Sequence, residues 1–207
     1  LATAMVLELC GGEASEVVTA GAVPDTTRSY RIEPARISSL VGMEIPEAFE
    51  GMDLDKLTGL LVLEELGRQA SFSVSYGAHT GIGTLPIVYF GNEEQKAKYL
   101  PKLISGEHVG SLAMSEAGAG SDVVSMKLRA DAVPGGFRLN GTKFWITNGT
   151  CADTLVVYAK TAPEAASRGI TAFLIEKDMA GFSIGQKIDK MGLRGSPTAE
   201  LVFDDCF

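Results

Sequence analysis

The sequence predicts an α+β fold, in which a helical N-terminal part is followed by an antiparallel β-sheet or small β-barrel. The prediction depends on a change of pattern near residue 108. Before it, apolar residues recur at the spacing of an amphipathic helix; after it, short β-prone runs alternate with Gly, Asn, Asp and Pro. The chain has 207 residues, which is enough for one large domain or two small ones.

Two helices are predicted between residues 47 and 108. Leucines spaced three or four apart indicate a first helix over residues 54–66, with Asp53 as a suitable N-cap. A second helix is predicted over residues 93–104, which are rich in Glu, Lys, Leu and Tyr. We expect Pro101 to kink or restart this helix, because proline lacks the backbone N–H that a helix interior uses.

The β-part is predicted from six short runs and one turn signal. The runs cover residues 123–130, 137–139, 143–147, 154–159, 170–175 and 201–203. Asn140-Gly141 lies between two of them, and this pair suits the positive φ angles of a two-residue type I′ turn. The sequence therefore predicts a hairpin centred on Asn140-Gly141, within a sheet that begins near residue 109.

Composition excludes several classes of protein. The formal net charge of −8 argues against binding to nucleic acid, which requires clustered Lys and Arg. Cys10, Cys151 and Cys206 are too far apart for a zinc site or a disulfide framework, and His79 and His108 lack partners at ligand spacing. No apolar run is long enough to span a membrane. We expect a cytoplasmic protein with no metal, and we expect the chain to be a fragment.

Two motifs in the β-part point to a bound redox ring. Residues 115–122 read Ser-Glu-Ala-Gly-Ala-Gly-Ser-Asp, so hydroxyls stand beside glycines whose backbone N–H groups can approach an anion. Residues 144–149 place the only tryptophan, Trp145, next to Thr147. A flavin needs both kinds of contact. Each motif alone also has a simpler interpretation: a flexible loop, a core aromatic, and hydroxyls bonded to backbone.

Three ordered motifs resemble the acyl-CoA dehydrogenase family. They are residues 112–122, residues 140–149, and the Lys-Met-Gly-Leu-Arg-Gly-Ser run at 190–196. Residues 109–207 most resemble the isovaleryl-CoA dehydrogenase branch, whereas about 47–108 resemble branches that handle longer acyl chains. The resemblance implies an N-terminal helical domain followed by a middle β-domain, and it implies that the C-terminal helical domain is absent from this chain.

The resemblance also implies a site. The residues implied to bind FAD are Leu112, Met114, Ser115, Gly120, Ser121, Trp145, Ile146 and Thr147. Those implied to contact the acyl-CoA substrate are Ser121, Ser167 and Arg168. Ala117 stands where the family usually has proline, which leaves the loop backbone less restricted and predicts weaker cofactor binding.

The resemblance implies no catalytic residue within this chain. The glutamate base of the family belongs to the helical domain expected after Phe207, and we expect Glu64, Glu65, Glu116 and Glu176 to be solvated instead. The implied function is α,β-dehydrogenation of an acyl-CoA, of which this chain carries the FAD-binding part. The implied partners are acyl-CoA, an electron-transfer flavoprotein and further copies in a homo-oligomer, with location in the mitochondrial matrix in a eukaryote.

Residues 1–46 are different. The stretches at 7–14 and 23–28, and the segment up to Pro46, resemble part of the bacterial phenylalanyl-tRNA synthetase β chain, without any aminoacylation motif. This suggests a composite chain with three segments: 1–46, 47–108 and 109–207. The alternative function is a non-catalytic composite or scaffold module, or a synthetase-derived binding fragment.

Overall fold

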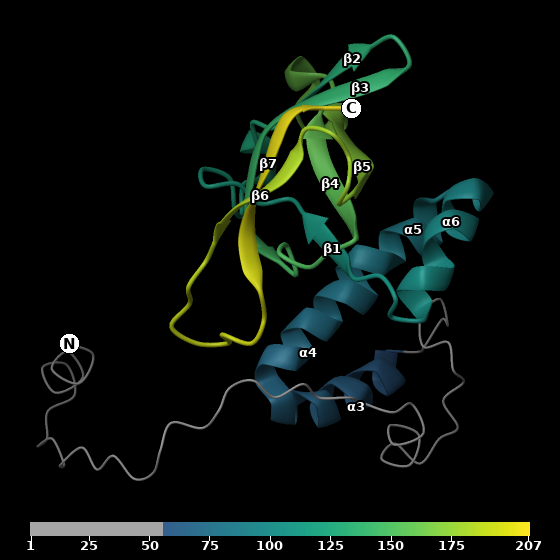
Figure 1. Cartoon of the computed structure of the whole chain (residues 1–207), viewed down its shortest axis with the longest axis vertical. Coiled ribbons are helices and arrows are strands. Elements are labelled where there is room, and N and C mark those ends of the chain that lie inside the picture. Colours follow the sequence, from purple (N-terminus) through teal and green to yellow (C-terminus); the bar gives the residue numbers. More distant parts are fainter. Residues whose placement is uncertain (1–55) are drawn as a thin grey trace, which may run out of the picture. The chain divides into compact units, whose positions relative to one another are not determined.

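The computed structural model describes residues 56–207, in which helices precede and pack beside a curled β-sheet (Figure 1). This confirms the predicted fold class. The expected N-cap Asp53 and the synthetase-like segment 1–46 lie outside the described residues. No helix among the described residues is long and apolar enough to cross a membrane.

Six consecutive helical segments form the first part. They are α3 (Lys56–Leu66), a 3₁₀ turn (Gly67–Gln69), α4 (Ala70–Gly77), a π-helix η2 (Ala78–Thr84), α5 (Leu85–Phe90) and α6 (Glu93–Ile104). α6 begins with a capping box, in which the Asn92 side chain accepts from the Gln95 amide and the Gln95 side chain accepts from the Asn92 amide. It continues through Pro101 without a restart.

Seven strands form one sheet. They are β1 (Gly110–Ala113), β2 (Arg129–Val133), β3 (Gly136–Thr147), β4 (Thr154–Lys160), β5 (Ile170–Glu176), β6 (Phe182–Lys187) and β7 (Thr198–Cys206). The order is β1-β4-β2-β3-β7-β6, and β5 also pairs with β4. Two 3₁₀ segments, Val123–Ser125 (η3) and Pro163–Gly169 (η4), lie in connections.

The sheet is largely antiparallel, as predicted, but two of the strand pairings of β4 are parallel. β1 runs parallel to β4, and β2 meets β4 in a parallel bridge between Arg129 and Lys160. Parallel neighbours need a long connection, and the whole β2–β3 hairpin lies between β1 and β4 in the chain. The sheet is therefore mixed.

The predicted hairpin at Asn140-Gly141 is wrong. These residues lie inside β3, and the turn between β2 and β3 is at Pro134-Gly135 instead. Gly141 does have a positive φ of 140°, but this conformation occurs at a register shift between β3 and β7. The absence of a side chain at Gly141 leaves room for Leu128. The glycine signal thus marked a β-bulge, and two of the predicted strands are one strand.

Only the end of another predicted strand, residues 123–130, is correct. Its first residues form the 3₁₀ segment η3, and β2 begins at Arg129. Leu128 and Ala130 are the members of this run that enter the sheet core, which explains why the apolar pattern resembled a strand.

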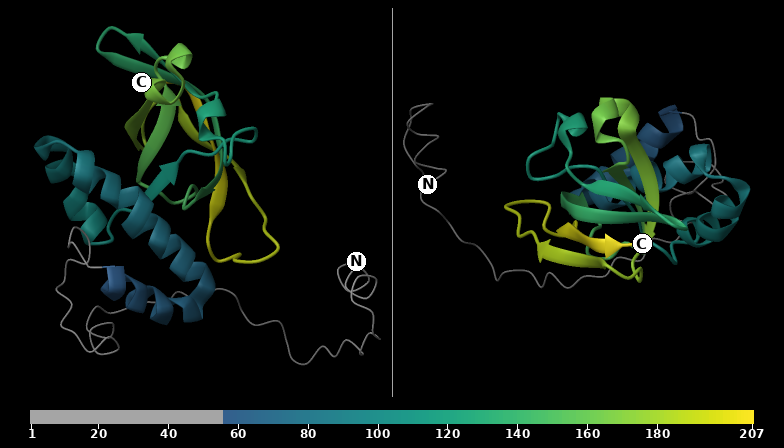
Figure 2. Two further views of the ribbon diagram at one scale, coloured as in Figure 1. Left: turned by 180° about the vertical axis from the view of Figure 1, so that it is seen from behind. Right: turned by 90° about the horizontal axis from the view of Figure 1, so that it is seen from above.

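Two apolar clusters hold the described residues together. The larger lies inside the curled sheet, with Leu128, Leu139, Leu155, Leu201 and Phe203 at or below 2 % exposure. The smaller joins the helices to the outer face of β4 and consists of Ile87, Tyr99, Leu103 and Val156. Each large side chain buried in this way contributes roughly 1.5–3 kcal/mol of transfer free energy. Figure 2 shows the helices on one side of the sheet, beside β1 and β4.

Candidate functional site

β1 lies beside the end of β3. The Ser111 hydroxyl donates to the Thr147 carbonyl over 2.6 Å, and the Phe144 amide donates to the Ser115 carbonyl over 2.9 Å. These two bonds bring together six of the eight residues predicted to bind the cofactor. We call the surface formed by Leu112, Met114, Ser115, Trp145 and Thr147 the β1–β3 strip; the sixth residue, Ile146, is only 3 % exposed, and its side chain belongs to the sheet core.

The apolar part of the strip comes from β1. Leu112 and Met114 are half-buried and alternate with Ala113, which faces the sheet core. They share their face with Gly110, whose missing side chain would otherwise contact His79 and Leu103 of the helical part. The strip therefore lies on the face of β1 that meets the helices.

Trp145 does not anchor the core. Its side chain is 53 % exposed, and its φ of +59° places it in the left-handed region, within the register shift between Lys143 and Ile146 against β7. The Phe144 ring meets the indole edge-on, with the centroids 4.7 Å apart. A large aromatic held exposed by an unfavourable backbone conformation indicates a functional role.

Two hydroxyls in the strip are available for a ligand. The side chains of Ser115 and Thr147 are half-buried, and neither makes a hydrogen bond to any residue between 56 and 207. Their backbones, by contrast, are used in the bonds between β1 and β3. The strip thus combines apolar surface, an exposed aromatic plane and two unused donors.

The glycine-rich loop continues from the strip. Glu116 and Ala119 exchange two backbone hydrogen bonds of 2.9 and 3.1 Å, which close a tight turn, and Gly120 and Ser121 follow in exposed positions. A Cβ added at Gly118 or Gly120 would meet no atom within 4 Å. Internal packing therefore does not require glycine there, whereas the close approach of a ligand would.

Glu116 is not solvated, contrary to the sequence expectation. It is 7 % exposed, and its carboxylate accepts from the Lys127 amide (2.6 Å), the Leu128 amide (2.9 Å) and the Lys143 ammonium (2.9 Å). Burial disfavours the carboxylate, but the three donors outweigh it and hold the pKa of Glu116 below its ordinary value. Burial lowers the pKa of Lys143, which Glu116 offsets in part.

Glu176 also has a defined role. Its carboxylate accepts from the Lys98 ammonium (2.6 Å) and the Tyr99 hydroxyl (2.8 Å), so it ties β5 to α6. These hydrogen bonds lower the pKa of Glu176. Glu64 is exposed, as expected.

Asn148 and His79, which the sequence reasoning did not assign, fix β1 against the helices. The Asn148 amide nitrogen donates to the carbonyls of Ser75 (2.9 Å) and Gly110 (3.3 Å). His79 Nδ1 accepts from the Gly110 amide (2.8 Å), which leaves Nε2 to donate to the Leu103 carbonyl (3.2 Å). An Asn-Gly pair that follows a strand was the available signal, since Asn148 adopts a φ of +63°.

A glycine allows the close approach on which this junction depends. A Cβ at Gly83, in the π-helix, would lie 2.7 Å from backbone atoms of Gly110 and Ser111. Only glycine fits there, and π-helical turns are frequent near functional sites. The helical part thus reaches the backbone of β1 at Gly110 and Ser111, next to the strip.

Ser167 and Arg168 lie elsewhere. Both are exposed in η4, which connects β4 to β5, and no hydrogen bond between described residues links them to the strip. The structure therefore brings the predicted cofactor residues together around β1 and β3, with Gly120 and Ser121 in the adjoining loop, but does not join the predicted substrate residues Ser167 and Arg168 to them.

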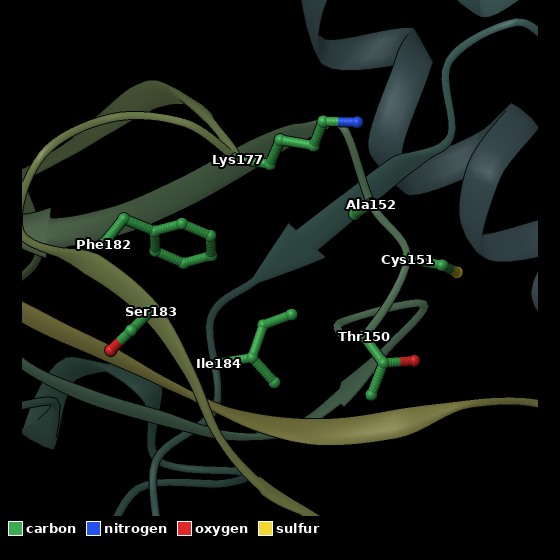
Figure 3. A pocket seen from close by; sticks show the side chains of 7 residues that line it. All are labelled: Thr150, Cys151, Ala152, Lys177, Phe182, Ser183 and Ile184. Carbon is green, nitrogen blue, oxygen red and sulfur yellow. The ribbon is translucent and has the colours of Figure 1, made fainter.

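A cavity of about 250 Å³ opens on another part of the sheet. Figure 3 shows its lining: Thr150, Cys151, Ala152, Lys177, Phe182, Ser183 and Ile184. No predicted site residue is among them. Lys177 pairs with Asp153 over 2.6 Å. Within residues 56–207, no three His, Cys, Asp or Glu side chains are grouped so that they could hold a metal ion.

Comparison with known proteins matches two domain models to the chain. Residues 10–107 match the model of the acyl-CoA dehydrogenase N-terminal domain, and residues 111–206 match that of the middle domain. The first match extends across the segment boundary expected at residue 46.

Individual relatives give the same result. The mitochondrial isovaleryl-CoA dehydrogenase of Solanum tuberosum is 59 % identical over 82 % of this chain, and the mitochondrial 2-methylacyl-CoA dehydrogenase of the same plant is 56 % identical over 82 %. The chain spans 41 % of the length of each. An acyl-CoA dehydrogenase from Bacillus anthracis, solved with FAD, has a TM-score of 0.69 and 44 % identity, over 81 % of this chain and 29 % of that one.

Related chains of this fold, the acyl-CoA dehydrogenase of Bacillus anthracis and PigA, have been solved with FAD. With both domain models matched in order, the chain belongs to the acyl-CoA dehydrogenase family.

Proposed function

We propose that this chain supplies the flavin-binding part of an acyl-CoA dehydrogenase, which oxidises the α,β bond of an acyl-CoA thioester. The observation that carries the proposal is the β1–β3 strip, in which Trp145 is exposed beside two hydroxyls that have no hydrogen-bond partner among residues 56–207. The chemistry that bound FAD would supply is that of an acceptor for the hydride that leaves the β-carbon of the acyl group.

The strip fits a flat, polar-edged ring. Leu112 and Met114 offer apolar contact, and the indole of Trp145 offers a plane for stacking. The Ser115 and Thr147 hydroxyls can donate to the ring's carbonyl and nitrogen acceptors, while the open backbone at Gly118 and Gly120 can approach the pyrophosphate. We assign Ser121 to the same loop contact, and Ile146 to a backbone contact.

The base that removes the α-proton is proposed to come from outside the described residues. Glu116 is next in sequence to Ser115, but three donors already bind its carboxylate. Proton abstraction would break these bonds and leave Lys143 buried without its partner, which is unfavourable. Glu116 therefore serves the structure of the site and does not act as the base.

The proposed substrate is a short branched acyl-CoA. The two relatives described above are named for isovaleryl- and 2-methylacyl-CoA; both acyl groups are branched, and the isovaleryl group is short. Residues 47–108 resemble branches that handle longer acyl chains, so binding of acyl-CoAs of increasing chain length is the measurement that tests this substrate. We assign Ser167 and Arg168 to the CoA phosphates, an electron-transfer flavoprotein as electron acceptor, and a homo-oligomeric assembly, located in the matrix in a eukaryote.

Titration of the purified chain with FAD tests the proposal. Because Trp145 is the only tryptophan, its fluorescence reports on the strip alone. We expect FAD to quench this fluorescence saturably and the protein to become yellow. Ser115→Ala should weaken FAD binding by roughly 2- to 10-fold, the effect of one lost hydrogen bond. Ser183→Ala, in the separate cavity, is the matched control. A colourless protein with unquenched fluorescence at high FAD would refute the proposal.

A further inference from the structure

The segment between β1 and β2 leaves the sheet at Met114 and returns at Leu128. Its tip, from Ala117 to Asp122, is exposed except for Ala119. Both of its ends meet one buried ion pair, formed by Glu116 and Lys143, with side-chain exposures of 8 % and 0 %.

Lys143 acts on the outgoing end of the segment. It is at an inward-facing position of β3, and its ammonium donates to the Met114 carbonyl and to Glu116 Oε1, each over 2.9 Å. A third contact, of 3.6 Å, is to the sulfur of Met126. All three ammonium protons are therefore directed at this segment, and Met114 belongs to the β1–β3 strip.

Glu116 acts on the returning end. Its two carboxylate oxygens accept the backbone N–H groups of Lys127 and Leu128, just before β2 begins. The carboxylate thus joins both ends of the segment to each other and to β3. Hydrogen bonds to an ionised group are shorter and roughly twice as strong as neutral ones. The Glu116 carboxylate therefore holds the two ends of the segment firmly in place.

A buried ion pair is an inefficient way to gain stability. Apolar residues of similar volume at such positions often give an equally or more stable protein, because desolvation of two charges costs several kcal/mol. What the pair provides that apolar side chains cannot is directional bonds to three backbone groups, at Met114, Lys127 and Leu128.

We propose that Lys143 and Glu116 are positioning residues for the flavin, which hold the Ser115 hydroxyl and the start of the glycine-rich loop in the geometry that the cofactor requires. This inference rests on the proposed function. Neither side chain reaches the strip surface, so both act through the backbone of Met114, Ser115 and the loop. We call this ion pair, with its bonds to the backbone of Met114, Lys127 and Leu128, the clamp. The clamp offsets the backbone freedom that the loop gains from Ala117, which stands where the family usually has proline.

The test is the double variant Glu116→Gln/Lys143→Met in the full chain. It removes both charges together and nearly preserves side-chain volume, so it avoids the uncompensated charge that a single change would leave. We expect the variant to fold, but amide hydrogen exchange at residues 115–128 should accelerate about 10-fold or more, while β4 and β5 keep their protection. FAD affinity should fall by about 10-fold or more, as when residues that support a site from behind are lost.

Two controls separate positioning from general stability. Arg129→Met/Asp131→Asn removes an exposed pair, with a 3.2 Å contact, from neighbouring β2 and should leave FAD affinity unchanged. Val157→Ala, in the sheet core, lowers the melting temperature without touching the loop. If Val157→Ala weakens FAD binding as much as the double variant at a matched melting temperature, the role is merely structural and the inference is overturned.

The remaining outcomes distinguish this inference from the proposed function. If the unaltered chain binds FAD and the double variant binds it equally well, or exchange at residues 115–128 is unchanged, the clamp fails while the function stands. If the unaltered chain binds no FAD, the proposed function fails and the flavin role of the clamp fails with it.

Discussion

Two connections of the sheet end in exposed tips, but they are held in different ways. The segment between β1 and β2 is fixed by a buried ion pair whose partners are the charged groups of Glu116 and Lys143. The connection between β4 and β5 is closed by hydrogen bonds between neutral groups. The Thr161 and Ala162 amides and the Thr161 hydroxyl donate to the Gly169 carbonyl, the Thr161 and Thr171 hydroxyls bond to each other, and the Ala165 amide donates to the Ala162 carbonyl. The first adjoins the β1–β3 strip and the second does not. Directional charged bonds thus occur in the connection that adjoins the proposed flavin contact and not in the other.

Lys143→Ala removes the main difference between the two connections, which is the buried ion pair. This change leaves the Glu116 carboxylate buried without its cation, and we expect the free energy of unfolding to fall by roughly 3–5 kcal/mol. Urea denaturation, with the fluorescence of Trp145 as the signal, measures this loss. A loss below about 1 kcal/mol would mean that the pair is not effectively buried and that the two connections are alike.

A second change tests whether the strip depends on the helices as well as on the clamp. Asn148→Ala removes donors to the Ser75 and Gly110 carbonyls, both of which then lose a buried partner. We expect a loss of roughly 1–3 kcal/mol of unfolding free energy. Asn148→Gly, which tolerates the positive φ at this position, separates backbone strain from the lost bonds: it should be about as destabilising if the bonds dominate.

Acid should act on the first connection and not on the second. The pKa of Glu116 lies below its ordinary value in the folded chain, so its contribution to stability is present above that ordinary value and is lost as the pH falls through the lowered one. We expect hydrogen exchange at the Lys127 and Leu128 amides, corrected for the intrinsic rate, to lose protection only at a pH below the ordinary pKa of a glutamate. The Thr161 and Ala162 amides, which bond to a carbonyl, should show no such local step.

The smallest effect is expected at Arg168. The side chain is exposed and pairs with no carboxylate among the described residues, so Arg168→Ala should change the unfolding free energy by no more than about 0.5 kcal/mol. FAD affinity should also stay the same. Affinity for a CoA thioester is the quantity that should fall, and binding unchanged for both ligands would remove Arg168 from the proposed site.

Local signals in the sequence predicted the fold well. The α6 helix was predicted from its content of Glu, Lys, Leu and Tyr, and its start is determined by residues three apart, Asn92 and Gln95, which cap it reciprocally. The strip was predicted from two motifs that carry its hydroxyls and its indole. Both cases depend on residues that are close together in the chain, and sequence patterns indicate such local interactions directly.

The features that escaped prediction depend on distant partners. Asn140-Gly141 has the same local preference in a turn and in a bulge, and only pairing with β7 decides between them. Glu116 looked like a loop carboxylate because its partner is 27 residues away. A signal existed: Lys143 follows Leu139 at the inward spacing of a strand, and a lysine at such a position requires a buried counter-charge.

The pairing of β1 with β4 has a consequence for synthesis of the chain. As translation proceeds, β1 emerges well before β4, because the entire β2–β3 hairpin is made in between. Until then the edge of β1 has unpaired N–H and C=O groups that can join strands of other nascent chains. The half of the strip that β1 provides is thus completed late, and sequence changes that delay the hairpin should lower the yield of soluble protein before they affect the finished fold.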